Sequence, residues 1–106
     1  MGWASAYPDP SDFLNRLFSG SRIGKTGGTN YSFFDDPAFN RRLAAADALP
    51  PPQRYDAYLR LDHDLVRTAP AIAYQNAARR EFLSARIGCH FDHPLYGIDL
   101  TLLCLR

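Results

Sequence analysis

The clearest group of side chains with chemical potential is the five-residue stretch "CHFDH" at residues 89–93. Cys89, His90, Asp92 and His93 are all of types that bind metal ions. The cluster is local, however, and has no spaced second half of the kind that completes a structural zinc site. We therefore interpret the stretch as a turn with two solvated histidines and predict neither a metal site nor a cofactor.

A second candidate is "RLDHDL" at residues 60–65, in which Asp62, His63 and Asp64 could perform acid–base chemistry. Consecutive residues of a helix point about 100° apart, so these three side chains would not converge on one substrate. A solvated helix face is the better interpretation. No nucleophile–base arrangement or pair of carboxylates in an apolar setting stands out, and we predict that the protein is not an enzyme.

A third candidate, "SGSRIGKT" at residues 19–26, is similar to a phosphate-binding loop at Gly24, Lys25 and Thr26. Such a loop needs a glycine where this chain has Ser19, and it lies between a buried strand and a helix. Here it follows an amphipathic segment and continues into Gly27-Gly28. The stretch is predicted to be a flexible surface loop.

The opening stretch "MGWASAYPDP" carries Trp3 and Tyr7 close together, immediately before a turn. Aromatic side chains in such places line small-molecule clefts, because they combine a flat apolar surface with a polar group. Such aromatic residues are found equally often in a hydrophobic core. The residue types leave both interpretations open.

The elements around these residues begin with a short predicted strand at residues 2–7, which the turn at residues 8–10 ends. Ser11 is the expected N-cap of a short helix whose apolar side extends from Phe13 to Phe18. After the glycine-rich loop, Asp36 and Pro37 have the capping acid and N1 proline typical of a helix start. Phe39, Leu43 and Ala46 should line the inner face of that helix.

The third and longest helix is predicted over residues 52–68, after the three prolines of residues 50–52. Its apolar stripe is broad and must face the strands. We expect four of its side chains to be buried and two polar ones to be exposed. The buried set is Tyr55, Leu59, Leu65 and Val66, and the exposed pair is Arg60 and Asp64; Tyr58 and Leu61 belong to the same stripe.

The rest of the chain looks like strands, at residues 71–74, 81–88 and 97–106, with a turn-rich connection between the last two. The order of one short strand, three helices and then strands indicates the α+β class. The length of 106 residues is enough for one domain and one modest core.

The overall composition limits the classes of partner that we expect for this chain. The formal net charge is +1, with scattered basic residues, and this gives no reason to expect a nucleic-acid partner. No apolar run is long enough to span a bilayer, and no secretory signal is visible at the start. Cys89 and Cys104 leave one pairing, but the favoured interpretation is two unpaired, half-buried thiols.

As a set, several of these motifs resemble the family 5 extracellular solute-binding proteins, the oligopeptide- and dipeptide-binding receptors of bacterial ABC importers. The similarity runs in register from "GW", "YPDP" and "FL" through "NYS", "DP" and "RY" to "AP". The matching residues are Gly2, Trp3, Tyr7, Pro8, Asp9, Pro10, Phe13, Leu14, Leu17, Phe18, Asn30, Tyr31, Ser32, Asp36, Pro37, Phe39, Arg54, Tyr55, Tyr58, Ala69, Pro70 and Ile72.

The resemblance implies that residues 1–106 are the C-terminal part of a type II periplasmic-binding-protein-like fold of two lobes. The first lobe and the beginning of the second would then be absent. It implies a periplasmic or extracellular, membrane-associated receptor for a peptide or other small solute that delivers its ligand to an ABC permease. An exposed lobe face could make the isolated chain self-associate. The alternative is a degenerate or truncated α+β module that binds no ligand of its own.

The resemblance also implies a ligand-binding strand made of Trp3, Ala4, Ser5, Ala6 and Tyr7. Peptide-binding members carry an aspartate immediately before the tyrosine, where this chain has Ala6. That carboxylate pairs with the ammonium of a bound peptide, and a charge-assisted contact of this kind contributes about 1.5–3 kcal/mol. Three consequences stay open: a ligand without an amino terminus, another acid in this role, or loss of binding.

Overall fold

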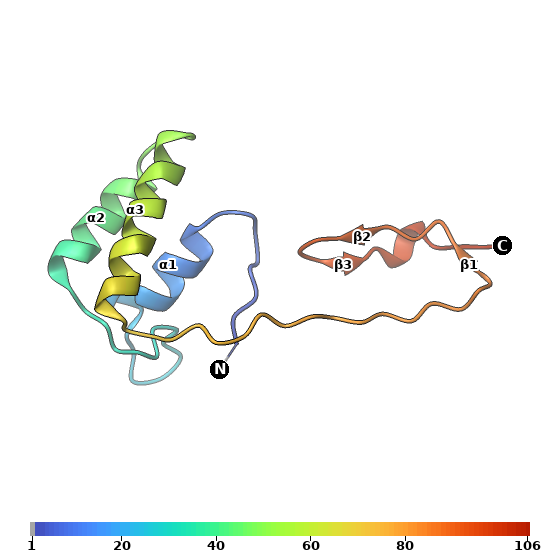
Figure 1. Cartoon of the computed structure of the whole chain (residues 1–106), viewed down its shortest axis with the longest axis horizontal. Coiled ribbons are helices and arrows are strands. Elements are labelled where there is room, and N and C mark those ends of the chain that lie inside the picture. Colours follow the sequence, from blue (N-terminus) through green and yellow to red (C-terminus); the bar gives the residue numbers. More distant parts are fainter. Residues whose placement is uncertain (1) are drawn as a thin grey trace. The chain divides into compact units, whose positions relative to one another are not determined.

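The computed structural model describes residues 2–106 and divides into two compact units, one ending at Ala73 and the other spanning Tyr74–Arg106. The first contains α1 (Ser11–Phe18), the 3-10 helix η1 (Gly20–Arg22), α2 (Pro37–Asp47) and α3 (Gln53–Thr68) (Figure 1). The predicted α+β character is therefore present as a helical unit and a small β unit.

The first helix begins at Ser11, the residue predicted to be its cap, so the cap lies one residue earlier than expected. Pro10 occupies the N-cap position, and Ser11 is already helical. The side chain that serves this end of the helix is Asp9, whose Oδ1 accepts the Ser11 N–H at 2.9 Å. An aspartate two residues before the donor closes an Asx turn, so the turn residue replaces the expected serine cap.

The predicted start of α2 is confirmed. Asp36 is its N-cap, and its Oδ1 accepts the N–H groups of Ala38 at 2.7 Å and Phe39 at 2.9 Å. Pro37 occupies the first turn, where its missing N–H costs nothing. Phe39, Leu43 and Ala46 are buried, as the spacing of these apolar residues predicts.

The third helix packs through a narrower face than expected. Tyr58, Leu61 and Leu65 are buried against the inner face of α2, with Leu14 of α1 completing the core. Of the four side chains predicted to be buried, only Leu65 is; Tyr55, Leu59 and Val66 are 46%, 57% and 73% exposed. The reason is geometric: these three lie on a neighbouring stripe of α3 that α2 does not cover.

The long loop between α1 and α2 is held by a buried asparagine. Asn30 is 2% exposed, and its side-chain amide donates to the carbonyl oxygens of Ser19 at 3.0 Å and Phe34 at 2.8 Å. Its Oδ1 accepts the Ser32 hydroxyl at 2.9 Å. One side chain thus supplies the partners that the backbone of an irregular segment needs.

The second unit contains two small antiparallel ladders. β1 (Ile87–Gly88) pairs with β4 (Cys104–Leu105), placing Gly88 opposite Cys104, and β2 (Asp92–His93) pairs with β3 (Gly97–Ile98). The 3-10 helix η2 (Leu100–Leu102) lies between β3 and β4 along the chain. Two of the expected long strands, at residues 81–88 and 97–106, are thus reduced to short pairs.

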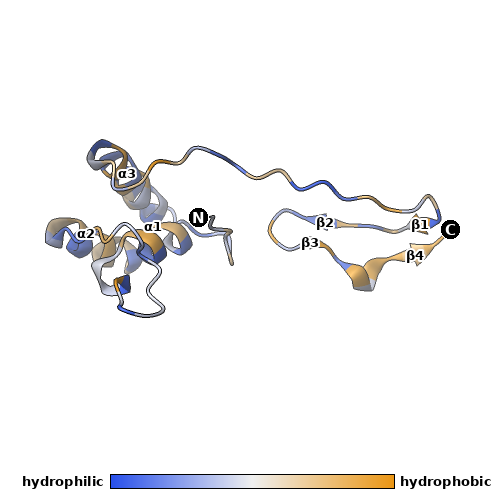
Figure 2. Cartoon of the chain, turned by 90° about the horizontal axis from the view of Figure 1, so that it is seen from below, coloured by the Kyte–Doolittle hydropathy of each residue, from blue (hydrophilic) through white to orange (hydrophobic). Residues whose placement is uncertain are grey.

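The strand predicted at residues 71–74 is wrong, because these residues carry no regular secondary structure. Ile72 and Tyr74 are 81% and 79% exposed. β-propensity describes a residue that fits a half-buried sheet surface, and none of the described strands pairs with residues 71–74. In Figure 2 the stretch through η2 and β4 is coloured mostly as hydrophobic, although Leu100 and Leu105 are about three-quarters exposed, at 75% and 74%.

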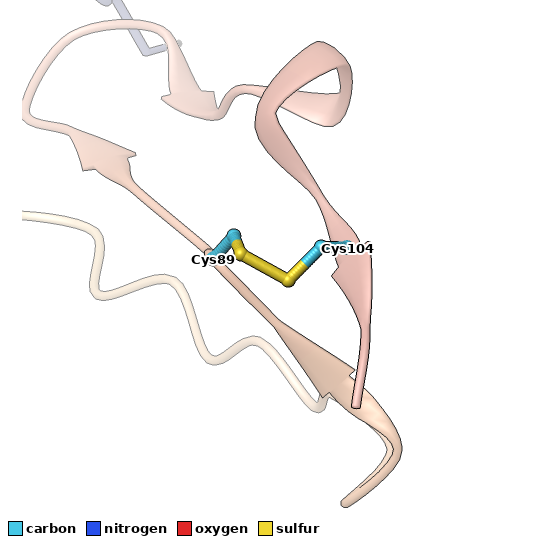
Figure 3. Close-up of a disulfide and its surroundings, with 2 residues drawn as sticks. All are labelled: Cys89 and Cys104. Carbon is cyan, nitrogen blue, oxygen red and sulfur yellow. A yellow bond between two sulfur atoms is a disulfide. The ribbon is translucent and has the colours of Figure 1, made fainter.

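A disulfide joins Cys89 to Cys104 and corrects the expectation of two unpaired thiols (Figure 3). Their Cα atoms lie 5.4 Å apart, a separation that the β1–β4 ladder sets by pairing Gly88 with Cys104. The sequence could not supply this distance. None of the helices within residues 2–106 is both long and apolar enough to cross a membrane.

Candidate functional site

The predicted ligand-binding segment, Trp3 to Tyr7, is not a strand: residues 2–5 have no regular secondary structure, and a bend begins at Ala6. Its exposure alternates: Trp3 and Ser5 are half-buried, whereas Ala4 and Ala6 are exposed. A period of two is what an extended backbone produces when one side rests on a protein surface. The strand prediction is wrong because no other described segment pairs with this one.

The backbone of this segment is unsatisfied at its centre. Among residues 2–106, no hydrogen-bond partner is found for the N–H or C=O groups of Trp3, Ala4 and Ser5. The Ser5 hydroxyl, by contrast, donates to the carbonyl oxygen of Tyr7. Backbone groups require partners, from water or from another chain. The segment therefore presents an edge to which an extended molecule could add.

A buried carboxylate fixes the end of the segment. Asp12, in the first turn of α1, is 1% exposed, and its Oδ2 accepts the Ala6 N–H at 2.6 Å. Its Oδ1 lies 3.8 Å from Nε of Arg16. Asp12 thereby joins the segment to α1, a role that sequence reasoning missed because the acid stands six residues away from its partner.

Asp9, the acid nearest to Ala6 in the turn, is also engaged. Its Oδ1 accepts the Ser11 N–H and lies 3.0 Å from a terminal nitrogen of Arg54. Burial opposes ionisation of Asp9, but the hydrogen bonds from Ser11 and the charge of Arg54 outweigh it and lower the pKa of the carboxyl group. Neither Asp9 nor Asp12 therefore offers an unoccupied carboxylate in place of the one that Ala6 lacks.

Beside the segment lies an apolar groove of about 920 Å³ between α1 and α3. Of the predicted site residues, only Trp3 lines this groove; Ala4, Ser5, Ala6 and Tyr7 do not. The indole N–H of Trp3 is buried and has no hydrogen-bond partner among the described residues. The ring thus anchors the segment on the helical unit, and the other predicted residues lie outside the groove.

Sequence reasoning missed the wall of the groove that α3 supplies. Tyr55, Leu59, Asp62 and Val66 all line it. Their spacing of i, i+4, i+7 and i+11 places them on one helix face, and this pattern was visible in the sequence. The sequence alone places Tyr55, Leu59 and Val66 with the buried residues, because the two stripes are adjacent and both are rich in apolar residues.

Two residues of the "CHFDH" stretch have partners within the second unit. Cys89 is consumed in the disulfide, and Nδ1 of His93 accepts the N–H groups of Leu95 at 3.2 Å and Tyr96 at 3.3 Å. Within residues 2–106, no group of three or more metal-ligating side chains is assembled.

The other two candidate stretches, at residues 60–65 and 19–26, lie in the helical unit. Asp64 of the "RLDHDL" stretch lies 2.7 Å from Arg42, so this acid supports the contact between α3 and α2. The stretch at residues 19–26 includes η1, and no helix starts directly after Lys25 and Thr26. A phosphate-binding loop requires such a helix start.

A scan against protein-family models and searches of the curated proteins and of the solved structures find no match for this chain.

Proposed function

We propose that this chain is the C-terminal part of a solute-binding component of a bacterial ABC importer, of the family 5 type, for peptides or similar small solutes. The observation that carries the proposal is the set of motif residues that runs in register from Gly2 to Ile72. In this role the protein performs no chemistry. It captures its solute non-covalently and delivers it to a permease in the membrane.

The segment Trp3–Tyr7 is the ligand-binding element of this proposal. Its unpaired backbone groups at residues 3–5 support the addition of an extended peptide as a neighbouring strand. The exposed side chains of Ala4, Ala6 and Tyr7 would contact the solute, while Trp3 holds the segment on the groove. Main-chain pairing of this kind provides affinity without selecting a particular side chain, which suits a transporter of varied peptides.

The disulfide supports a periplasmic or extracellular location. Disulfides persist in oxidising compartments and are rare in the reducing cytosol. The bond between Cys89 and Cys104 closes a loop in the second unit, none of whose described residues belongs to the buried hydrophobic core. A receptor outside the cytoplasmic membrane meets both its solute and its permease in such a compartment.

Calorimetric titration of the oxidised chain with an N-acetylated, extended tetrapeptide tests this proposal, with proline substitutions as the diagnostic variants. Neighbouring N–H groups of an extended chain point to opposite edges, so only one edge can pair with the ligand. Of Ala4→Pro and Ser5→Pro, we expect one to weaken binding by about tenfold and the other to have little effect. Ser5→Ala is the matched control, because it removes the hydroxyl and keeps the N–H.

Equal behaviour of the two proline variants would remove the segment from the binding site. No heat of binding for any peptide, with circular dichroism showing intact helices, would support the alternative of an α+β module that binds nothing.

A further inference from the structure

The wall that α3 gives to the groove is an uncovered apolar surface. Tyr55, Leu59 and Val66 are 46%, 57% and 73% exposed, and Phe13 of α1, across the groove, is 39% exposed. The stripe from Tyr55 to Val66 extends about 16 Å along the helix at 1.5 Å per residue. An exposed stripe of this kind, apolar except at Asp62, is typical of a surface that binds another protein.

A second stripe, of three charged residues and one histidine, runs beside the first. Asp56, Arg60, His63 and Arg67 repeat the spacing of Tyr55, Leu59, Asp62 and Val66, displaced by one residue. All four are exposed, and none forms a salt bridge with a described residue. An apolar seam flanked by unpaired charges is the pattern by which two helices recognise each other.

The charges at the two ends of this stripe are opposite in sign, so the stripe is complementary to a second, antiparallel copy of itself. The acid, Asp56, lies in the first turn of α3 and the base, Arg67, lies in the last turn. Two copies of α3 packed antiparallel would place Asp56 of each copy near Arg67 of the other, twice by symmetry. Parallel packing would place the two charged stripes on opposite sides of the seam, where these pairs could not form.

We propose that this face binds a second copy of the chain, with the two α3 helices antiparallel and the α1 helices on the outside. The apolar stripe supplies the buried contact, and the pairs between Asp56 and Arg67 fix the orientation. Asp62 is the one carboxylate of the groove lining, so its desolvation opposes the association and limits its strength. This inference does not depend on ligand binding.

Sedimentation velocity of the full oxidised chain over a range of concentrations tests the proposal. We expect a reversible monomer–dimer equilibrium that high salt weakens. Asp56→Arg and Arg67→Asp should each raise the dissociation constant by about tenfold, since each converts two attractive pairs into two repulsive ones. The double variant should restore it to within about threefold of the original value.

Further variants distinguish this interface from any other. Asp62→Leu should strengthen the dimer and Leu59→Glu should abolish it, and Arg41→Asp on exposed α2 surface is the matched charge-reversal control. Circular dichroism confirms that each variant keeps its helices. A monomer at every soluble concentration would overturn the proposal, and so would a dimer that the α3 reversals leave unchanged or that the double variant fails to restore.

Discussion

The hydroxyl group of Tyr58 lies 3.0 Å from Oδ1 of Asp47 and so joins the middle of α3 to the last residue of α2. Asn15 of α1 completes the contact, with its Oδ1 3.0 Å from the same hydroxyl and its amide donating to Asp47 Oδ2 at 3.0 Å. Tyr58 is 1% exposed. One phenol therefore holds all three helices together at the edge of the core.

This arrangement predicts an alkaline instability. Burial, followed by the hydrogen bond to Asp47 and the charge of that residue, raises the pKa of Tyr58 to about 12. The folded state therefore favours the neutral phenol. Its contribution is complete below the ordinary pKa of 10.0 and is lost as the pH rises toward 12. The free energy of unfolding should fall more steeply over this range in the wild type than in Tyr58→Phe, and parallel curves would contradict the assignment.

The two apolar stripes of α3 predict opposite responses at adjacent positions. Leu65 is 6% exposed, so Leu65→Ala should reduce the free energy of unfolding of the helical unit by about 2–5 kcal/mol. Val66 is 73% exposed, so Val66→Ala should change it by less than about 0.5 kcal/mol in a monomeric sample. Urea denaturation followed by helical circular dichroism measures both. Similar losses for the two variants would mean that the stripe assignment is wrong.

Removal of the disulfide should loosen the second unit alone. Cys89 and Cys104 are separated by 15 residues, and closing such a loop stabilises a fold by about 3 kcal/mol. In the double variant Cys89→Ser, Cys104→Ser, amide exchange should accelerate within residues 87–105. Exchange in α2 and α3 should stay as it is, because neither helix contains a cysteine. Faster exchange throughout the chain would show that the two units do not unfold separately.

Restoring the acid that peptide receptors carry should change the preference among peptides. Ala6 is exposed, so Ala6→Asp can be accommodated without disturbing the core. We expect tighter binding of a peptide with a free amino terminus and no gain for its N-acetylated form, because a carboxylate pairs with an ammonium group. Ala6→Asn is the isosteric control without charge. An equal gain for both peptides would show that the amino terminus lies elsewhere.

Local signals in the sequence predict the helices well. Asp36 and Pro37 mark the start of α2 by a capping mechanism that acts within three residues, and Phe39, Leu43 and Ala46 follow the helical period. The strands were harder to predict, because a strand exists only where a partner pairs with it. Residues 71–74 have the composition of a strand but remain irregular.

The candidate site was harder to predict, because its contacts join residues that lie apart in the sequence. The aromatic start of the chain drew attention to Trp3, which does line the groove, but not to Asp12, whose buried carboxylate fixes Ala6. The disulfide was missed for a similar reason, since its Cα distance depends on the pairing of β1 with β4. The α3 wall was present in the spacing of Tyr55, Leu59 and Val66, but only the packing shows which of two adjacent stripes is covered.

The central claim is that the backbone edge of residues 3–5 binds an extended peptide. Amide exchange measured by nuclear magnetic resonance, with and without the N-acetylated tetrapeptide, tests it most directly because it reports on each N–H group. We predict slower exchange at Ala4 or at both Trp3 and Ser5, with shift changes centred on residues 3–7. Unchanged exchange at these three residues, or changes confined to Tyr74–Arg106, would contradict the claim.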